Sequence, residues 1–321
     1  MPRHRLWRNR GLLGAGPGRD RDGLTPRVHF GSIVDVSPIA SQVLATSTGR
    51  PYVLALFAAF LLGAVTKTGW VRALVFAAIA GGAGFAAELA SLRWGFPFGE
   101  HHFLEAAHGS ELWVAGVPAW SPLASCALAW LGFQLAVLLH SPVEATAHDL
   151  QVLDTLPIRR SARVLLTGSI LAMLPQVLLA PLSALGDRWF LGRLHDFGTP
   201  GIFFGVPATA IVGWAAVAAI AIFLFQRIDS RLVTPSPLLR AGQAHLPFGG
   251  LFEPLVYAAV AALGIALAAS IGEPLLAMVG SFVFVPLAVV YAAHLVGAPS
   301  RATAAEREAH RRDFPRSRAL A

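Results

Sequence analysis

The chain has 321 residues, of which 55% are apolar and only 13% are charged, and its mean hydropathy is +0.61. A soluble domain carries about a quarter charged residues, so this composition excludes an ordinary water-soluble globule. The formal net charge is +7. No aromatic interleaving or base-reading module accompanies the arginines, so we expect no nucleic-acid partner. We assign the basic charge to membrane topology and to anionic lipid.

Apolar runs of about 20 residues recur along the chain, which is the length that a helix needs to cross the hydrocarbon core. Backbone groups in lipid must bond within their own segment, so these runs indicate helices rather than the shorter alternating strands of a barrel. The seven predicted spans are 51–65, 70–90, 113–139, 164–182, 201–225, 254–271 and 274–296, with Pro118, Pro122 and Pro175 inside them. The sequence therefore predicts an all-α, polytopic transmembrane helical bundle.

The bundle is expected to occupy residues 49–297, between a basic N-terminal tail (1–48) and a basic C-terminal tail (298–321). Both tails are rich in arginine, and we expect them to be solvated and disordered. Residues 33–45 are too short and too polar to span the membrane and are expected, at most, at its interface. The first 27 residues lack the apolar stretch and cleavage site of a signal peptide.

Basic residues near the span ends are distributed unequally between the two sides of the seven-span arrangement. One side carries Lys67, Arg72, Arg159, Arg160, Arg163, Arg227, Arg231, Arg240 and the C-terminal tail; the other carries Arg50, Arg93, Arg188, Arg193 and the N-terminal tail. The positive-inside rule predicts that the first side is cytoplasmic, so the C-terminus lies inside a bacterial cytoplasmic membrane. The single cysteine, Cys126, lies within a span and excludes an intramolecular disulfide.

Polar residues gather in two blocks, one between spans two and three and one between spans four and five. The first block contains Glu88, Arg93, the run 95–103 (Gly-Phe-Pro-Phe-Gly-Glu-His-His-Phe), Glu105, His108, Glu111 and the run 116–118 (Gly-Val-Pro). The second contains the run 186–192 (Gly-Asp-Arg-Trp-Phe-Leu-Gly), His195, Asp196, Phe197, the run 203–207 (Phe-Phe-Gly-Val-Pro) and Gly213-Trp214. The shared plan suggests an internal repeat whose two halves enclose one midplane site.

These blocks resemble those of the membrane-integral carotenoid biosynthesis proteins, a family that includes the carotenoid 1,2-hydratases of the non-photosynthetic type. The resemblance covers about 51–296 and is carried by Glu88, the Gly-Phe-Pro-Phe-Gly run ending at Gly99, Glu111-Leu112-Trp113, both Gly-Val-Pro runs, the run 186–192 and Gly213-Trp214. Some polar positions of the family pattern differ. The family has Asp at Gln176, Ala180 and Ser121, Asn at Ala210 and Tyr at His101. The Gly, Pro and Trp positions of the family pattern are therefore kept, whereas several of its polar positions carry other residues.

The resemblance implies addition of water across a terminal isoprenoid double bond of a carotenoid, which is a hydratase (carbon–oxygen lyase) activity without cofactor or metal. The implied partners are a carotenoid or another lipophilic isoprenoid, membrane lipid and other enzymes of the carotenoid pathway. Alkene protonation needs a carboxylic acid shielded from solvent, and a second group must hold the water. Aromatic faces can stabilise the resulting carbocation.

Glu88 ends an apolar run and is the first candidate acid, since ionisable groups at membrane depth are costly and often functional; otherwise it is a helix-end carboxylate paired with Arg93. The other catalytic candidates are Asp187, which otherwise pairs with Arg188 or caps a helix, and His101 and His102, which are otherwise plain interfacial residues. The candidate substrate-binding residues are Trp94, Phe98, Gly99, Pro118, Trp189, Phe204, Gly205, Pro207 and Trp214. The glycines and prolines among them are expected to set loop geometry. Glu105, His108 and Glu111 are expected on a solvated amphipathic face.

Three other functions were weighed beside a hydratase, and two of them remain. A di-iron hydroxylase needs more clustered histidines than His101, His102 and His108 supply among the 11 in the chain. A small-molecule membrane transporter would also use paired broken helices around a midplane site. A non-catalytic relative that binds carotenoid or assists the pathway enzymes would explain the replaced polar positions.

Overall fold

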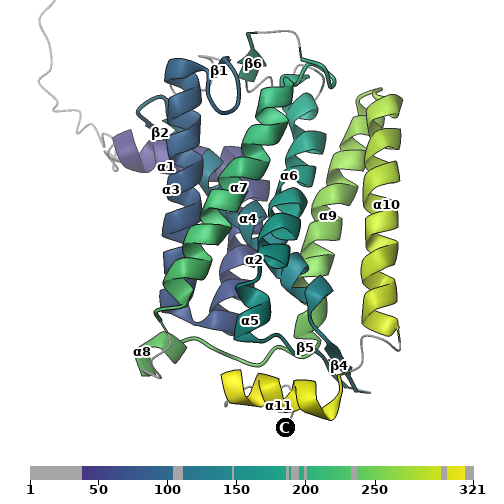
Figure 1. Cartoon of the computed structure of the whole chain (residues 1–321). Helices are drawn as coiled ribbons and strands as arrows, with labels where there is room; N and C mark the ends of the chain where they lie inside the picture. The colour runs from purple at the N-terminus through teal and green to yellow at the C-terminus, as the bar shows by residue number, and fades with distance from the viewer. Residues whose placement is uncertain are drawn as a thin grey trace, which may run out of the picture. The chain divides into compact units, whose positions relative to one another are not determined.

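The computed structural model describes residues 38–103, 111–146, 148–185, 188, 195–198, 201–232, 237–297 and 302–314, all within one compact unit. Seven helices in these ranges are long and apolar enough to cross a membrane (Figure 1). They are α2 (Pro51–Thr68), α3 (Trp70–Trp94), α4 (Trp120–His140), α6 (Ala162–Ala184), α7 (Ala208–Asp229), α9 (Gly249–Ser270) and α10 (Pro274–Val296). The prediction of an all-α, polytopic bundle with about seven spans is confirmed.

Shorter elements lie at the ends of these helices. They are α1 (Pro38–Gly49), α5 (Leu156–Arg159), α8 (Pro237–Arg240), α11 (Ala304–Asp313), β1 (His101–Phe103), β2 (Trp113–Val114), β3 (Val117–Pro118), β4 (Val143–Ala145), β5 (Leu150–Val152) and β6 (His195–Phe197). The strands form antiparallel pairs: β1 with β6, β2 with β3, and β4 with β5. We call the end with β1 and β6 the β1 end, and the end with α5, α8, β4, β5 and α11 the α11 end (Figure 1).

Two predicted spans, 113–139 and 201–225, begin too early. The first of these starts with the β2–β3 hairpin, and α4 begins only at Trp120. In the second, Phe203 and Val206 form a bridge and α7 begins at Ala208. Each segment is apolar enough to resemble a span but contains a tight turn that a helix cannot include. The two Gly-Val-Pro runs therefore precede α4 and α7 and do not kink them, and Pro118 is not inside a helix.

The turns before these two helices have the same backbone conformation. Ala115 and Gly116 have φ of 52° and 85°, and Phe204 and Gly205 have φ of 47° and 85°. Two successive residues at positive φ are characteristic of the type I′ turn, which closes a two-residue hairpin. The two blocks are thus equivalent at this point of the backbone, as the internal repeat suggested.

α4 forms the centre of the bundle. The structure buries 72% of its most apolar window, against 28–50% for the other six helices. Its Trp130 and Phe133 pack with Phe60, Phe76 and Phe225 from three other helices, with ring centroids 5.0–6.2 Å apart. A Cβ at Gly132 of α4 would lie 2.4 Å from the carbonyl oxygen of Gly168 in α6. Small residues of this kind let membrane helices approach closely.

The C-terminal tail is ordered over residues 302–314, which differs from the expected disordered arm. Thr303 and Glu306 form a capping box that starts α11. Arg307 bonds both carboxylate oxygens of Glu144 in β4, at 2.8 and 3.0 Å, and the buried His310 bonds the carbonyl oxygen of Asp154 at 2.7 Å. These contacts fasten α11 across the end of the bundle. The first 37 residues lie outside the described part of the chain.

Candidate functional site

A carboxylate, an imidazole and a hydroxyl meet at the β1 end of the bundle. Oε2 of Glu88, on α3, lies 3.0 Å from Nε2 of His101 in β1. The Ser121 hydroxyl, at the start of α4, donates to Oε1 of Glu88 at 3.0 Å. The side chains of His101 and Glu88 are 5% and 17% exposed, so the pair is largely shielded from the surroundings. His101 and Ser121 thus take the place of the Arg93 partner that the alternative assignment of Glu88 required.

The hydrogen bonds of His101 define where one of its protons resides. Nδ1 lies 3.2 Å from the carbonyl oxygen of Gly99, which can only accept, so Nδ1 carries a proton. Nε2 therefore either accepts from a protonated Glu88 or, in the imidazolium, donates to the carboxylate. Burial disfavours the imidazolium, but the hydrogen bond and charge of Glu88, together with the Gly99 carbonyl, outweigh burial and raise the pKa of His101 above its ordinary value. In either arrangement the pair holds one exchangeable proton between the two side chains.

Aromatic rings surround His101. Phe103 lies edge-on to the imidazole with a centroid distance of 5.4 Å, and Phe197 of β6 lies at 6.1 Å. Trp113 packs edge-on against Phe103 at 5.5 Å. The β1–β6 pairing sets His101 opposite Phe197 and His102 opposite Asp196. Because successive residues of a strand face opposite ways, His102 points away from Glu88 and is exposed.

The two polar blocks contact each other directly. A Cβ at Gly99 would lie 3.2 Å from Pro207 and 3.1 Å from Thr209, and a Cβ at Gly213 would lie 2.8 Å from the Pro97 carbonyl oxygen. Both glycines are needed because the loop before β1 packs tightly against the start of α7. The two blocks therefore pack against each other at this end of the bundle, and their contribution to one site stays a prediction.

Beneath this interface lies a small apolar cluster of Ala87, Phe98, Ala180, Val206 and Ala210. Trp214 packs on it, with its ring 6.3 Å from that of Phe98. Ala180 and Ala210 are two of the positions at which this chain lacks the polar residue of the family pattern. Their methyl groups leave the cluster without a polar side chain.

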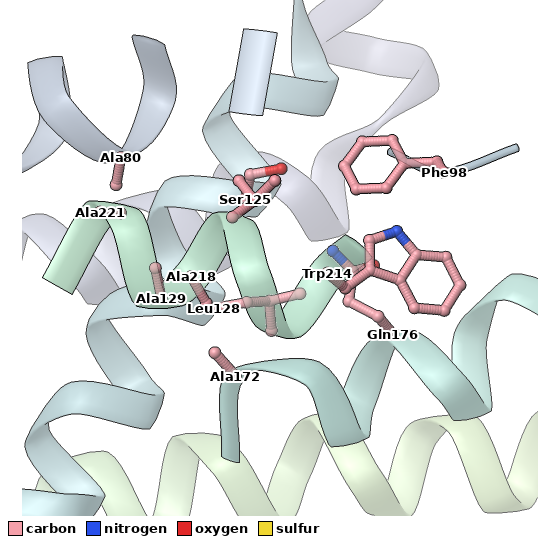
Figure 2. A pocket seen from close by; sticks show the side chains of 11 residues that line it. Ala80, Phe98, Ser125, Leu128, Ala129, Ala172, Gln176, Trp214, Ala218 and Ala221 are labelled. Atoms are coloured by element: carbon pink, nitrogen blue, oxygen red, sulfur yellow. The ribbon is translucent and has the colours of Figure 1, made fainter. Parts of the chain in front are cut away.

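A cavity of about 30 Å³ opens below the cluster, between α3, α4, α6 and α7. Figure 2 shows Phe98, Ser125, Gln176 and Trp214 around it, with alanines from the four helices completing the wall. A water needs roughly 10–15 Å³ of such space and two to four polar partners, so the cavity is large enough for about two waters. Ser125, which lines the cavity, lies one helical turn beyond Ser121 on α4. Because Ser121 donates to Glu88, the cavity lies about one turn deeper in the bundle on the same side of α4.

The remaining predicted site residues are dispersed. Trp94 is 76% exposed at the end of α3, and Pro118 is buried in β3, opposite Trp113. Phe204 packs edge-on against Phe203 at 4.9 Å, and Gly205 forms the turn before Pro207. Asp187 and Trp189 lie outside the described residues, as do Glu105 and His108 and the side chain of His195. Arg188 pairs with Glu273.

Glu111, next to the site, lies in surroundings that differ from the predicted ones. Glu111 was expected on a solvated face but is only 7% exposed. It pairs with Arg50 at 2.8 Å and accepts from Nε1 of Trp120 at 3.0 Å, while Arg50 lies 5.3 Å from the centre of the Trp120 ring. Trp120 directly precedes Ser121, so this contact positions the start of α4. The signal that could have identified it is an acid directly before the apolar run 112–120, which contains two tryptophans.

The positions at which we expect this chain to differ from the family pattern lie together in space. Ser121 and His101 both contact Glu88, Ala180 and Ala210 share the apolar cluster, and Gln176 lines the adjoining cavity. Within the described ranges, no group of three or more His, Cys, Asp or Glu side chains is placed to hold a metal ion. The site therefore offers a proton-holding pair, aromatic walls and space for water.

The chain was compared with protein-family models, curated proteins and solved structures. Residues 48–285 match the family model described as carotenoid biosynthesis protein. No curated protein and no solved structure gives a significant match. The family match covers most of the chain and includes α2 to α9, the Glu88–His101 pair and both polar blocks. The chain belongs to the carotenoid biosynthesis protein family.

Proposed function

We propose that the protein adds water across a terminal isoprenoid double bond of a carotenoid, with the Glu88–His101 pair as its acid–base group. The observation that carries this proposal is the shielded carboxylate at a span end, held between an imidazole and a hydroxyl. A carotenoid is confined to the bilayer. This protein belongs to a carotenoid biosynthesis family and has seven helices that can cross the membrane, so it can meet such a substrate within the bilayer. Hydration needs an acid, space for a water and a surface that tolerates a cation, and the Glu88–His101 pair, the adjoining cavity and the nearby aromatic rings offer these.

The chemistry returns the pair to its starting state. Glu88, in its protonated form, gives its proton to the less substituted alkene carbon, and the double bond becomes a tertiary carbocation. Water adds to the cation through its oxygen, and the excess proton passes to the Glu88–His101 pair. Ser121 keeps the Glu88 carboxylate oriented through both steps. One water is consumed and no electron acceptor is needed.

The surroundings of the pair support entry of the two reactants by different routes. Water is accommodated by the cavity lined by Ser125, Gln176 and Trp214. The isoprenoid end is too large for that cavity and would approach laterally from lipid, where Trp94 and Phe96 are 76% and 73% exposed at the β1 end.

Since basic residues concentrate at the α11 end, the positive-inside rule assigns that end to the cytoplasm and the site to the opposite face of the membrane.

A pathway experiment tests the reaction. The full chain is expressed in a host that makes lycopene, in medium containing ¹⁸O-labelled water, and the pigments are analysed by mass spectrometry. We expect a tertiary alcohol that carries the label. Glu88→Gln should lower its yield by about 100-fold or more, in line with loss of general acid–base catalysis. Glu100→Gln, which changes an exposed carboxylate in the loop between α3 and β1, should retain the yield. Oxygen arriving from O₂ instead would exclude hydration.

A second candidate is a non-catalytic carotenoid-binding protein that assists the pathway enzymes. The apolar cluster of Ala87, Phe98, Ala180, Val206 and Ala210 favours it, because small side chains beside aromatic rings suit a polyene better than they suit acid–base chemistry. In the same host, this candidate predicts pigment that co-purifies with the protein and no alcohol in any variant. Replacing Ala180 or Ala210 by Leu would then release the pigment.

A further inference from the structure

A second, much larger cavity occupies the α11 end of the bundle. Its volume is about 700 Å³, within the range of small-molecule sites. Residues of α2, α3, α4, α5, α7 and α9 line it, and the segment 239–246 and α11 close it. Glu88 is not among them, since it lies near the far end of α3. The cavity is therefore separate from the site proposed for hydration.

Six charged residues in the lining already form ion pairs with one another. They are Lys67 with Glu253, Arg72 with Asp229 at 2.8 Å, and Arg159 with Asp154 at 2.7 Å. Each pair compensates its own charge in a site that is partly withdrawn from water. These residues build the wall and leave no net charge for a ligand.

Arg160 and Arg240 also line the cavity, and they have no such compensation. Among the described residues, no carboxylate lies within salt-bridge distance of either guanidinium, and Arg160 makes only a 3.5 Å contact with the backbone oxygen of Asp229. Nε of Arg160 is buried without a partner. The remaining carboxylate of the lining, Asp313, accepts from the backbone N–H of Leu156 at 3.0 Å and lies 3.4 Å from Nε of Arg312. Two guanidinium groups that line one cavity with no carboxylate at salt-bridge distance favour an anion there.

Gln134 provides an independent observation. This residue of α4 is only 6% exposed and lines the inner wall of the cavity, and its Nε2 is buried without a hydrogen-bond partner in the described part of the chain. A buried donor without a partner destabilises the folded protein, so such a group is usually paired with a ligand or an ordered water. An uncharged donor deep in the cavity and two guanidiniums in its wall together match an anion with several acceptor oxygens.

We propose that this cavity binds a phosphate-bearing anion, through Gln134, Arg160 and Arg240. A phosphate group offers several strong acceptors and is the anion that the forked guanidinium pairs with best. The cavity lies where the spans end, so both a phospholipid headgroup and a soluble phosphate can reach it. His310, Asp313 and Phe314 of the C-terminal segment line its outer side, so α11 covers the bound anion.

Binding is measured on the purified full chain by thermal unfolding and by native mass spectrometry. One arm adds inorganic diphosphate to the protein in detergent, with sulfate at equal ionic strength as the reference anion. The other arm reconstitutes it in nanodiscs of phosphatidylglycerol or phosphatidylcholine. Stabilisation by diphosphate in detergent identifies a soluble ligand. Retention of phosphatidylglycerol, without a response to diphosphate, identifies a lipid headgroup. A wild-type protein that responds to neither probe overturns the proposal.

Three variants test whether the anion binds at the proposed residues. Arg160→Gln/Arg240→Gln should weaken binding of the responding probe at least tenfold, whereas Arg231→Gln, an exposed arginine at the same end that does not line the cavity, should bind as the wild type does. Gln134→Leu keeps the side-chain volume and removes the unpaired donor. It should therefore raise the unfolding temperature without ligand and lower the affinity. Equal binding by wild type and by the double variant would refute the assignment.

Discussion

Glu88 and His101 are 13 residues apart in the chain, and their side chains lie 3.0 Å apart between Oε2 and Nε2. α3 ends and β1 begins between them, so this contact ties the end of a membrane helix to the strand that pairs with β6. One contact thus supports the fold at the β1 end and holds the proton that the proposed reaction needs. The predictions below test these roles and the packing around them.

The contribution of this pair to stability should depend on pH. His101 has a pKa above its unfolded value of about 6.5, so its stabilisation is complete below that pH and is lost as the pH rises through the folded pKa. The difference in unfolding temperature between wild type and His101→Gln should therefore shrink between pH 6 and pH 9. His102→Gln, which changes the exposed neighbour, should give a small difference at every pH. A difference that grows with pH would mean that the pKa is lowered.

The Arg50–Glu111 ion pair should be among the most sensitive positions near the site. Both side chains are under 10% exposed, and Arg50→Gln would leave Glu111 buried and unpaired. Breaking a pair of this kind costs about 3–5 kcal/mol, while removing both charges costs less. We expect a large loss of thermal stability in Arg50→Gln and partial recovery in Arg50→Gln/Glu111→Gln. Product yield should fall in the single variant because Trp120 and Ser121 are no longer held. Equal losses in the single and double variants would contradict the pairing.

Two glycine-to-alanine substitutions should have opposite effects. At Gly132 the new Cβ would lie 2.4 Å from the Gly168 carbonyl oxygen, so α4 and α6 must separate, at a cost of roughly 1–3 kcal/mol. At Gly82 of α3 a Cβ meets no atom within 4 Å, and alanine is the better helix former. Thermal unfolding in detergent should show Gly132→Ala destabilised and Gly82→Ala unchanged or stabilised. Similar behaviour of the two variants would show that α4 and α6 are less closely packed.

Membrane orientation can be tested with two reporter fusions. Because the seven candidate helices cross the membrane from one end of the bundle to the other, the β1 end and the α11 end lie on opposite sides of it. Green fluorescent protein fused after the C-terminus should fluoresce, because the α11 end is expected in the cytoplasm. Alkaline phosphatase inserted near Asp196, at the β1 end, should be active outside. Fluorescence from a fusion at both positions would overturn the seven-span topology.

Much of this architecture could be predicted from local properties of the sequence. The free energy of transferring a side chain into lipid accumulates over about 20 neighbouring residues, so apolar runs indicate spans without knowledge of the fold. For the same reason Glu88 was identified as unusual, since a carboxylate at the end of such a run is costly there. Boundaries were less predictable. Residues 113–118 and 201–206 are apolar, but paired turns at positive φ keep them out of α4 and α7.

Only the tertiary structure decided which side chains meet. Ser121 reaches Glu88 across 33 residues, and Arg50 reaches Glu111 from the junction of α1 and α2, because helix packing and short hairpins bring them together. The same holds for Gln134 of α4 and Arg160, which directly follows α5; both line one cavity. Transfer into lipid is a property of each segment alone, whereas the partner of a buried polar group depends on how separate segments pack. The sequence by itself therefore determined the spans and indicated Glu88 as an unusual acid, and the packing determined which residues form the two proposed sites.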